Sequence, residues 1–259
     1  MKNLFTILAA FFIMLIAAPT IVMAQDGAAT EQIDGEKDLP FQQAVKKIFI
    51  DGGYVFMSLV LITLILGLAL CIERIIYLNM AQTNTDKLLG NVEDALNSGG
   101  VDAAKELLRN TKGPVASIFY QGLERSGDGI EMVEKSVVNY GSVQVGQMEN
   151  GLSWISLFIA LAPMLGFMGT VLGMIDAFEA IAAANNISPA VVADGIKVAL
   201  ITTVSGLFVA IVLQIFYNYI LSKIDSLTND MDIASISLID MLSKHNLTSS
   251  SPSKHNLSK

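Results

Sequence analysis

Hydroxyl groups are the side chains that could do chemistry inside the apolar parts of this sequence. Thr170 lies in one long apolar stretch, and Thr202 and Thr203 lie in the next. A hydroxyl donates one hydrogen bond and accepts two, so it can serve a proton carrier without being one. The middle of each long apolar stretch contains no Asp, Glu, Lys, Arg or His. Because a proton relay in lipid needs a titrating group, this chain alone lacks that group.

Small residues accompany two of these threonines at helical spacing. One set follows the intervals four, three and four, and a second set repeats those intervals: Gly166, Thr170, Gly173 and Ala177; Ala199, Thr203, Gly206 and Ala210. Each set lies on one face of an α-helix. Close helix packing through small residues explains such a stripe, with a threonine bonded to its own helix. Alternatively, the two stripes line an interior, formed by several copies, that holds another helix.

The composition of the chain indicates that these residues lie in a membrane. Of 259 residues, 53% are hydrophobic and only 15% are charged, whereas a soluble domain has about 25% charged residues. We expect an all-α fold with three transmembrane helices, at 53–72, 151–178 and 195–222, since a span needs about 20 apolar residues. The later two are long enough to tilt or to project beyond the bilayer.

Composition also excludes several functions. A net charge of −8 argues against nucleic acid, since phosphate binding needs clustered bases. The single Cys71 excludes an internal disulfide, and both His245 and His255 lie in the polar tail, so we expect no metal site and no cofactor. No nucleotide loop, nucleophile elbow or zinc-helix motif is present, which disfavours an enzyme.

The N-terminus has the pattern of a secretory signal. Residues 1–24 begin with a charge, continue as an apolar run and end at the small residue Ala24. We therefore expect a signal peptide cleaved after Ala24, with an uncleaved membrane anchor as the alternative. Residues 25–52 then form a periplasmic segment before the first span.

Charge in the connecting segments predicts the orientation. The 73–150 segment carries seven bases, Arg74, Lys87, Lys105, Arg109, Lys112, Arg125 and Lys135. The 179–194 loop and its edges carry mainly acids, Asp176, Glu179 and Asp194. The positive-inside rule places 73–150 and the C-terminal 223–259 on the cytoplasmic side of the membrane, and the 179–194 loop on the opposite, periplasmic side.

The cytoplasmic segment is predicted to be helical. Thr85–Asp86 can cap a helix that reaches Leu96 and ends at Gly99–Gly100, and a short helix follows at 102–109 before Gly113–Pro114. From Ile130, apolar residues recur every three or four positions, which predicts one helix continuing into the second span. The alternative is two helices hinged at Gly146 or Gly151. The repetitive, polar tail after Lys244 is expected to be disordered.

Two charged pairs at the span ends are weaker candidates. Asp176 and Glu179 lie at the outer end of the second span, where most carboxylates are simply solvated. Glu73–Arg74, at the inner end of the first span, favours an interfacial anchor, with a structural ion pair as the alternative.

The second and third spans resemble the MotA/TolQ/ExbB proton-channel family, and most of all ExbB. The resemblance rests on Ala162–Ile175 (APMLGFMGTVLGMI), on Gly195–Leu207 (GIKVALITTVSGL), and on the Ala210–Ile211 and Tyr217–Asn218 pairs that follow. It implies a homopentameric ring whose second and third helices surround transmembrane helices of a partner. The family's pore threonines correspond to Thr170 and Thr203, with Thr202 beside them.

The resemblance also implies partners and a task. An ExbD-like single-span protein would bring the membrane aspartate, and a TonB-like protein would receive the mechanical work for outer-membrane transport. The alternatives are a TolQ-like role in envelope maintenance, a gliding or secretion motor, and a non-conducting membrane scaffold.

Two positions depart from the family pattern. Val198 stands where the family usually has a glutamate near the start of the third helix, which casts doubt on any proton path through that carboxylate. Val212 stands where a proline commonly follows Ala-Ile, which predicts a straighter third helix.

Overall fold

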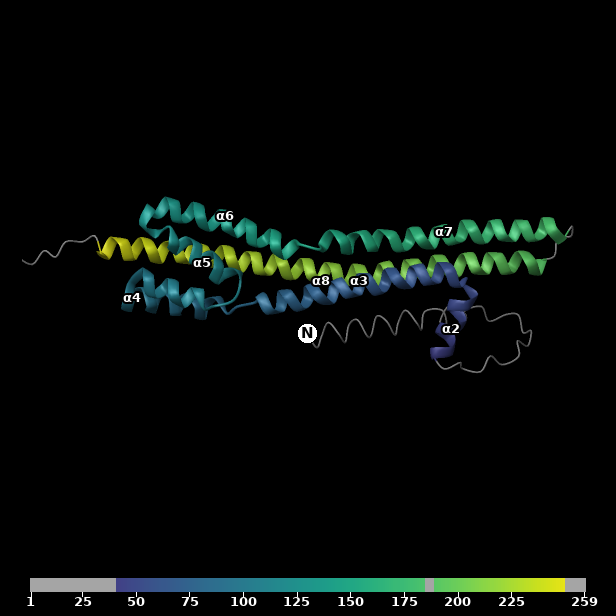
Figure 1. Ribbon diagram of the computed structural model, residues 1–259, viewed down its shortest axis with the longest axis horizontal. Helices are drawn as coiled ribbons and strands as arrows, with labels where there is room; N and C mark the ends of the chain where they lie inside the picture. Colours follow the sequence, from purple (N-terminus) through teal and green to yellow (C-terminus); the bar gives the residue numbers. More distant parts are fainter. Residues whose placement is uncertain (1–40, 185–188, 250–259) are drawn as a thin grey trace, which may run out of the picture. The chain divides into compact units, whose positions relative to one another are not determined.

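The computed structural model describes residues 41–184 and 189–249 (Figure 1). The predicted signal peptide, most of the segment that follows it, and the end of the tail lie outside these residues. The chain divides into two units, Met1–Lys46 and Lys47–Lys259. In the first unit, only the beginning of helix α2 (Phe41–Asp51) is described. The description below concerns the second unit, whose described residues form helices and no strand.

Three helices are long and apolar enough to cross a membrane, as predicted: α3 (Tyr54–Ala81), α7 (Leu152–Ala184) and α8 (Pro189–Ser249). At 1.5 Å per residue, the 61 residues of α8 extend about 90 Å, roughly three times the thickness of a hydrocarbon core. The C-terminal half of α8 therefore lies outside the bilayer. Val212 lies within this unbroken helix.

The three spans pack side by side. The helices α7 and α8 are antiparallel neighbours along most of α7, and α3 contacts both of them (Figure 1). The contact between α3 and α8 is close, because a Cβ on Gly67 would lie 2.6 Å from Cδ1 of Leu213. The absence of a side chain at Gly67 therefore allows α3 and α8 to lie close together.

Three shorter helices gather around the C-terminal half of α8: α4 (Thr85–Arg109), α5 (Pro114–Glu124) and α6 (Ile130–Glu149) (Figure 1). A single-turn 3₁₀ helix, η1 (Ser126–Asp128), connects α5 to α6. Phe119 and Leu123 of α5 and Leu238 of α8 are fully buried at this end. These helices form one continuous core with the membrane-spanning part.

The predicted breaks in the first part of this region are confirmed. Gly100 leaves the helical conformation (φ 70°, ψ −162°), which interrupts α4 where the glycine pair predicts it. The helix ends at Arg109, and α5 begins at Pro114. The predicted N-cap of α4 is wrong by one position. The N-cap is Asn84 and not Thr85, and its side chain accepts a hydrogen bond from the backbone N–H of Lys87 at 3.0 Å.

The prediction of one helix running from Ile130 into the second span is wrong. The chain leaves the helix at Asn150 (ψ 134°) and Gly151 (φ 85°), and α7 begins at Leu152. Positive φ is a conformation that glycine adopts without strain. The Arg74 side chain also fills the space beside Gly151, where a Cβ would lie 3.2 Å from its Nε. The alternative, a hinge at Gly151, is correct, and Gly146 remains inside α6.

Candidate functional site

The small residues of the two stripes form the contact between α7 and α8. A Cβ on Gly206 would lie 2.5 Å from the carbonyl oxygen of Ala162, and one on Gly166 would lie 2.9 Å from that of Thr202. Nearer the C-terminus of α7, a Cβ on Gly173 would lie 3.3 Å from the backbone nitrogen of Ala199. Ala177 and Ala199 are buried there, and Ala210 is half-buried. Within one chain, these residues therefore allow two backbones to approach closely.

Thr202 belongs to this contact. Its side chain is fully buried, and its hydroxyl donates to the carbonyl of Ala199 at 2.8 Å. Gly169 faces it from α7, where a Cβ would lie 2.7 Å from the Thr202 Oγ1. Of the three candidate threonines, Thr202 is thus enclosed between helices of its own chain.

Thr170 and Thr203 lie at the edge of the contact and are both half-buried. The Thr203 hydroxyl crosses between helices and donates to the carbonyl of Gly166 at 3.3 Å. In a helix, that same carbonyl accepts the backbone N–H of the residue four positions later, which is Thr170. The two threonines therefore adjoin one carbonyl group. The Thr170 hydroxyl donates to the carbonyl of Phe167 at 2.6 Å.

The side of α8 that carries Thr203 differs from the side that contacts α3. Where α3 begins, a Cβ on Gly53 would lie 3.6 Å from Val198 of α8, and Gly67 contacts Leu213. At 100° per residue, Val198 and Leu213 lie about 140° and 80° around the helix from Thr203, in the same sense. We call this open side the threonine edge and define it as Thr170, Thr203, Phe167 and Leu207. Phe167 is 67% exposed and Leu207 is 48% exposed.

The threonine edge can exchange hydrogen bonds but cannot carry a charge. Each hydroxyl already donates its proton within the chain, so its oxygen retains a lone pair for an incoming donor such as water or a protonated acid. Among the described residues, no cluster of three or more His, Cys, Asp or Glu side chains could hold a metal ion. The site is therefore polar, uncharged and open to a neighbouring surface.

Within the described residues of the three spans, charged side chains lie at the ends and not in the middle. Asp176, Glu179 and Asp194 are exposed. Next to Val198, Lys197 forms an ion pair with Asp51, at the end of α2, with Nζ and Oδ2 2.6 Å apart. The sequence analysis missed Asp51, because nothing in its neighbourhood indicates a partner so far along the chain.

At the other end of the first span, Arg74 has a structural environment. Its Nε lies 2.8 Å from a carboxylate oxygen of Glu73, and its guanidinium carbon lies 5.3 Å from the centre of the Tyr77 ring. It also packs against Gly151 at the break between α6 and α7. The alternative prediction for Glu73–Arg74, a structural ion pair, is thus present, and its contact with Gly151 was not predicted.

Three membrane-spanning helices with a polar, uncharged edge define a helical membrane protein whose spans contain no Asp, Glu, Lys, Arg or His in their middle. Residues 110–233 match the model of the MotA/TolQ/ExbB proton channel family. The chain belongs to this family and is most similar to its ExbB members. It is thus a membrane protein of a proton-channel family and not a member of a known enzyme family.

Relatives in distant organisms support this assignment. A biopolymer transport protein ExbB homolog of Methanothermobacter thermautotrophicus is 34% identical over 186 residues, which cover 71% of this chain and 66% of the relative. The ExbB protein of Neisseria meningitidis is 26% identical over 205 residues, covering 73% of this chain and 92% of the relative. The Tol-Pal system protein TolQ of Haemophilus influenzae is 32% identical over 87 residues, covering 34% and 38%. The chain thus spans about two thirds of the archaeal relative's length.

Proposed function

We propose that this chain is an ExbB-like stator subunit that couples a proton gradient to mechanical work. It acts with an ExbD-like single-span protein that carries a membrane aspartate, and the work is delivered to a TonB-like protein for outer-membrane transport. The observation that carries the proposal is the combination of an acid-free membrane interior with hydroxyls at an open edge. A proton pathway with this surface requires a carboxyl from elsewhere.

The proposed assembly is a homopentamer whose threonine edges face inward. The partner's helix inserts among these edges, and its aspartate comes beside Thr170 and Thr203. When protonated, the aspartic acid donates to a threonine oxygen that already donates its own proton elsewhere; when ionised, it accepts from a hydroxyl that has turned away from its carbonyl. The hydroxyls thus accommodate both protonation states without becoming charged.

The proposed setting is the bacterial inner membrane. The signal peptide is removed, the N-terminus and the α7–α8 connection face the periplasm, and the α4–α6 helices and the C-terminus face the cytoplasm. Support comes from the distribution of Lys and Arg, since the segment that forms α4, α5 and α6 contains six of them and the 179–194 loop contains none. Lys and Arg are enriched in cytoplasmic loops.

Two observations favour other roles. The similarity to TolQ supports a TolQ-like function in envelope maintenance, with a corresponding single-span partner. The absence of the family's glutamate at Val198, where the neighbouring Lys197 pairs with Asp51, supports a scaffold that gathers partner helices without conducting protons.

Co-purification with candidate single-span proteins, followed by native mass spectrometry, tests the proposed assembly. We expect a ring of five copies with a smaller number of copies of a partner whose span contains an aspartate. A stable ring that binds no Asp-bearing span would contradict the proposal. Proton flux in vesicles that contain both proteins then separates the motor from the scaffold, because a scaffold gives none.

A further inference from the structure

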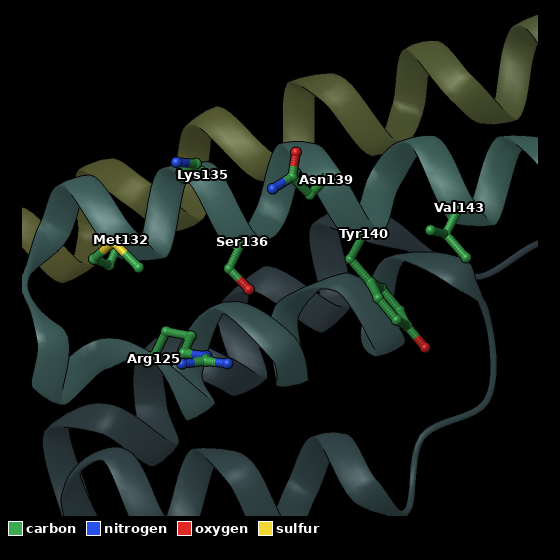
Figure 2. Close-up of a pocket in the computed structure, with 7 residues that line it drawn as sticks. All are labelled: Arg125, Met132, Lys135, Ser136, Asn139, Tyr140 and Val143. Carbon is green, nitrogen blue, oxygen red and sulfur yellow. The ribbon is translucent and has the colours of Figure 1, made fainter.

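A groove with a cationic end lies along one flank of α6 and beside Arg125, the residue that follows α5, outside the predicted spans (Figure 2). Its cavity volume is about 310 Å³. Arg125 and Lys135 supply the charge, Asn139 and Tyr140 supply polar groups, and Val143 supplies an exposed apolar surface. Figure 2 shows Tyr140 reaching from α6 to the side on which Arg125 lies. We call this feature the α5–α6 groove.

The α5–α6 groove is suited to an acidic and apolar surface. Arg125 forms an ion pair with Asp128, in which its Nη1 lies 3.5 Å from a carboxylate oxygen. A guanidinium has five N–H donors, so this pair leaves donors over. The three carboxylates of α6, Glu131, Glu134 and Glu149, do not line the groove. Its cationic end therefore has donors available for an additional carboxylate.

A surface with the complementary chemistry lies on the extramembrane half of α8. Three carboxylates and two isoleucines recur there at helical spacing: Asp225, Asp232, Ile233, Ile236 and Asp240. The carboxylates of 225, 232 and 240 are exposed, and Ile233 and Ile236 are 56% and 63% exposed. We call this surface the acidic face of α8. Such isoleucines, outside the bilayer, are typical of a surface that another protein covers.

The acidic face cannot reach the groove of its own chain. Leu238 is buried against α5 and α6, with its Cδ2 3.4 Å from where a Cβ on Gly122 would lie. Ile236 is two positions away, so it lies about 200° around the helix and points away from that core. Only another molecule can bring an acidic face to the groove.

The two surfaces lie at matching heights. A Cβ on Gly122 would contact both Val137 of α6 and Leu238 of α8, so these two residues mark one level. The helices run in opposite directions with the same rise per residue. Lys135 is therefore level with Asp240, and Asn139 is level with Ile236, each within about one turn. The ammonium of Lys135 thus has the same height as the carboxylate of Asp240, and Asn139, in the middle of the groove, has the same height as Ile236.

Symmetry preserves this match between copies. Copies inserted into one membrane share one orientation, so a ring relates them by rotation about the membrane normal, and rotation leaves height unchanged. In such a ring each interface is heterologous, with one surface facing a neighbour and a different surface facing the other neighbour. A groove on one helix and a complementary face on another meet this requirement.

We propose that the α5–α6 groove of each copy receives the acidic face of α8 from the next copy. The inference rests on the ring of the proposed function and adds the surfaces that close it outside the membrane. Lys135 and Arg125 meet Asp240 of the neighbour, and the isoleucines cover the apolar part of the groove.

Disulfide cross-linking tests the contact. In full-length protein with Cys71→Ala, the pair Asn139→Cys and Ile236→Cys should form, on oxidation, a ladder of covalent dimers and higher multimers, because each copy is linked to both neighbours. The matched control pairs Val138→Cys with Ile236→Cys. Val138 is exposed at the same height but does not line the groove, so the control should remain monomeric.

The outcomes separate the inference from the proposed function. An intact ring by native mass with no ladder, or an equal ladder in the control, overturns only the contact between groove and face. A monomer by native mass overturns the ring as well.

Charge exchange gives a second readout. Lys135→Glu alone and Asp240→Lys alone should each weaken association at every interface, by up to about fivefold for a surface ion pair, with the helical circular dichroism unchanged. The double variant should restore the ring. Glu134→Lys, on the opposite flank of α6, where Glu134 is exposed and does not line the groove, should have no effect. Single variants that weaken the ring without rescue in the double would overturn the pairing.

Discussion

Thr170 and Thr203 differ from Thr202 by their surroundings and not by their chemistry. All three hydroxyls donate to carbonyls, but Thr202 is enclosed and the other two border an open edge. The sequence predicts the set, because hydroxyls are conspicuous in an apolar helix. It could not separate the three, since that distinction depends on which side of α8 is covered by α3.

Removing both edge hydroxyls should stop proton-driven work. We expect Thr170→Val with Thr203→Val to abolish proton flux in vesicles that contain the partner, because valine keeps the shape but offers no hydrogen bond. Ring assembly, measured by native mass, should be unchanged. The control, Thr170→Ser with Thr203→Ser, retains the hydroxyls and should retain most of the flux. Flux in the valine variant equal to the wild type would defeat the assignment of these residues.

The ion pair between Lys197 and Asp51 should contribute little to stability. The Lys197 side chain is 52% exposed, and exposed pairs typically contribute about 0.2–1 kcal/mol. A double-mutant cycle with Lys197→Met and Asp51→Asn, followed by thermal unfolding in detergent, should give a coupling energy in that range. A coupling well above 1 kcal/mol would show that this pair does more than join α2 to α8.

At the scale of the helices, absent side chains set the architecture. Gly166, Gly173 and Gly206 let α7 and α8 approach, and Gly67 does so for α3 and α8. Spacing of three and four residues placed Gly166, Gly173 and Gly206 on helix faces, but packing and pore-lining surfaces share that spacing, and Gly67 was not singled out. The stripes could therefore be found from the sequence, while their burial within one chain could not.

Adding one methyl group at the α7–α8 contact should be costly. The Cβ in Gly206→Ala would lie 2.5 Å from the Ala162 carbonyl oxygen, and overpacking of this kind typically costs about 1–3 kcal/mol. Thermal unfolding in detergent should show the loss. The control Gly146→Ala, in open space within α6, should be neutral or stabilising by about 0.5–1 kcal/mol. Equal effects of the two substitutions would contradict the close contact.

The break between α6 and α7 depends on one glycine and on a residue from another helix. Periodic apolar residues continue across Asn150–Gly151, so the sequence alone favours a continuous helix. The structure differs because Gly151 has φ 85° and Arg74 occupies the space beside it. A contact between positions so distant in the chain leaves no local pattern.

Substitution at Gly151 should separate backbone conformation from helix continuity. Gly151→Val should destabilise the protein by about 1–3 kcal/mol, since a β-branched residue with positive φ is strained and meets Arg74. Gly151→Asn should cost less, because asparagine tolerates positive φ better. Thermal unfolding of both variants checks the order. If valine were the better tolerated of the two, the hinge would not be required.

For the whole molecule, composition and hydropathy predicted the all-helical class, the three spans and the long extensions beyond them. These properties follow from the bilayer, which requires about 20 apolar residues per helix and accepts few charges. The helical stripes and the family resemblance both indicated Thr170 and Thr203 of the threonine edge, whereas Phe167 and Leu207 were identified from the structure. The packing of α4, α5 and α6 on α8 was not predicted, because it depends on contacts between segments far apart in the chain.

The central claim is that this subunit provides a proton pathway that another protein's acid completes. It is tested by proton flux into vesicles that contain either this chain alone or this chain with its Asp-bearing partner, under the same imposed gradient. We expect flux only with the partner, and none when the partner's aspartate is changed to asparagine. Rapid flux through this chain alone would contradict the account.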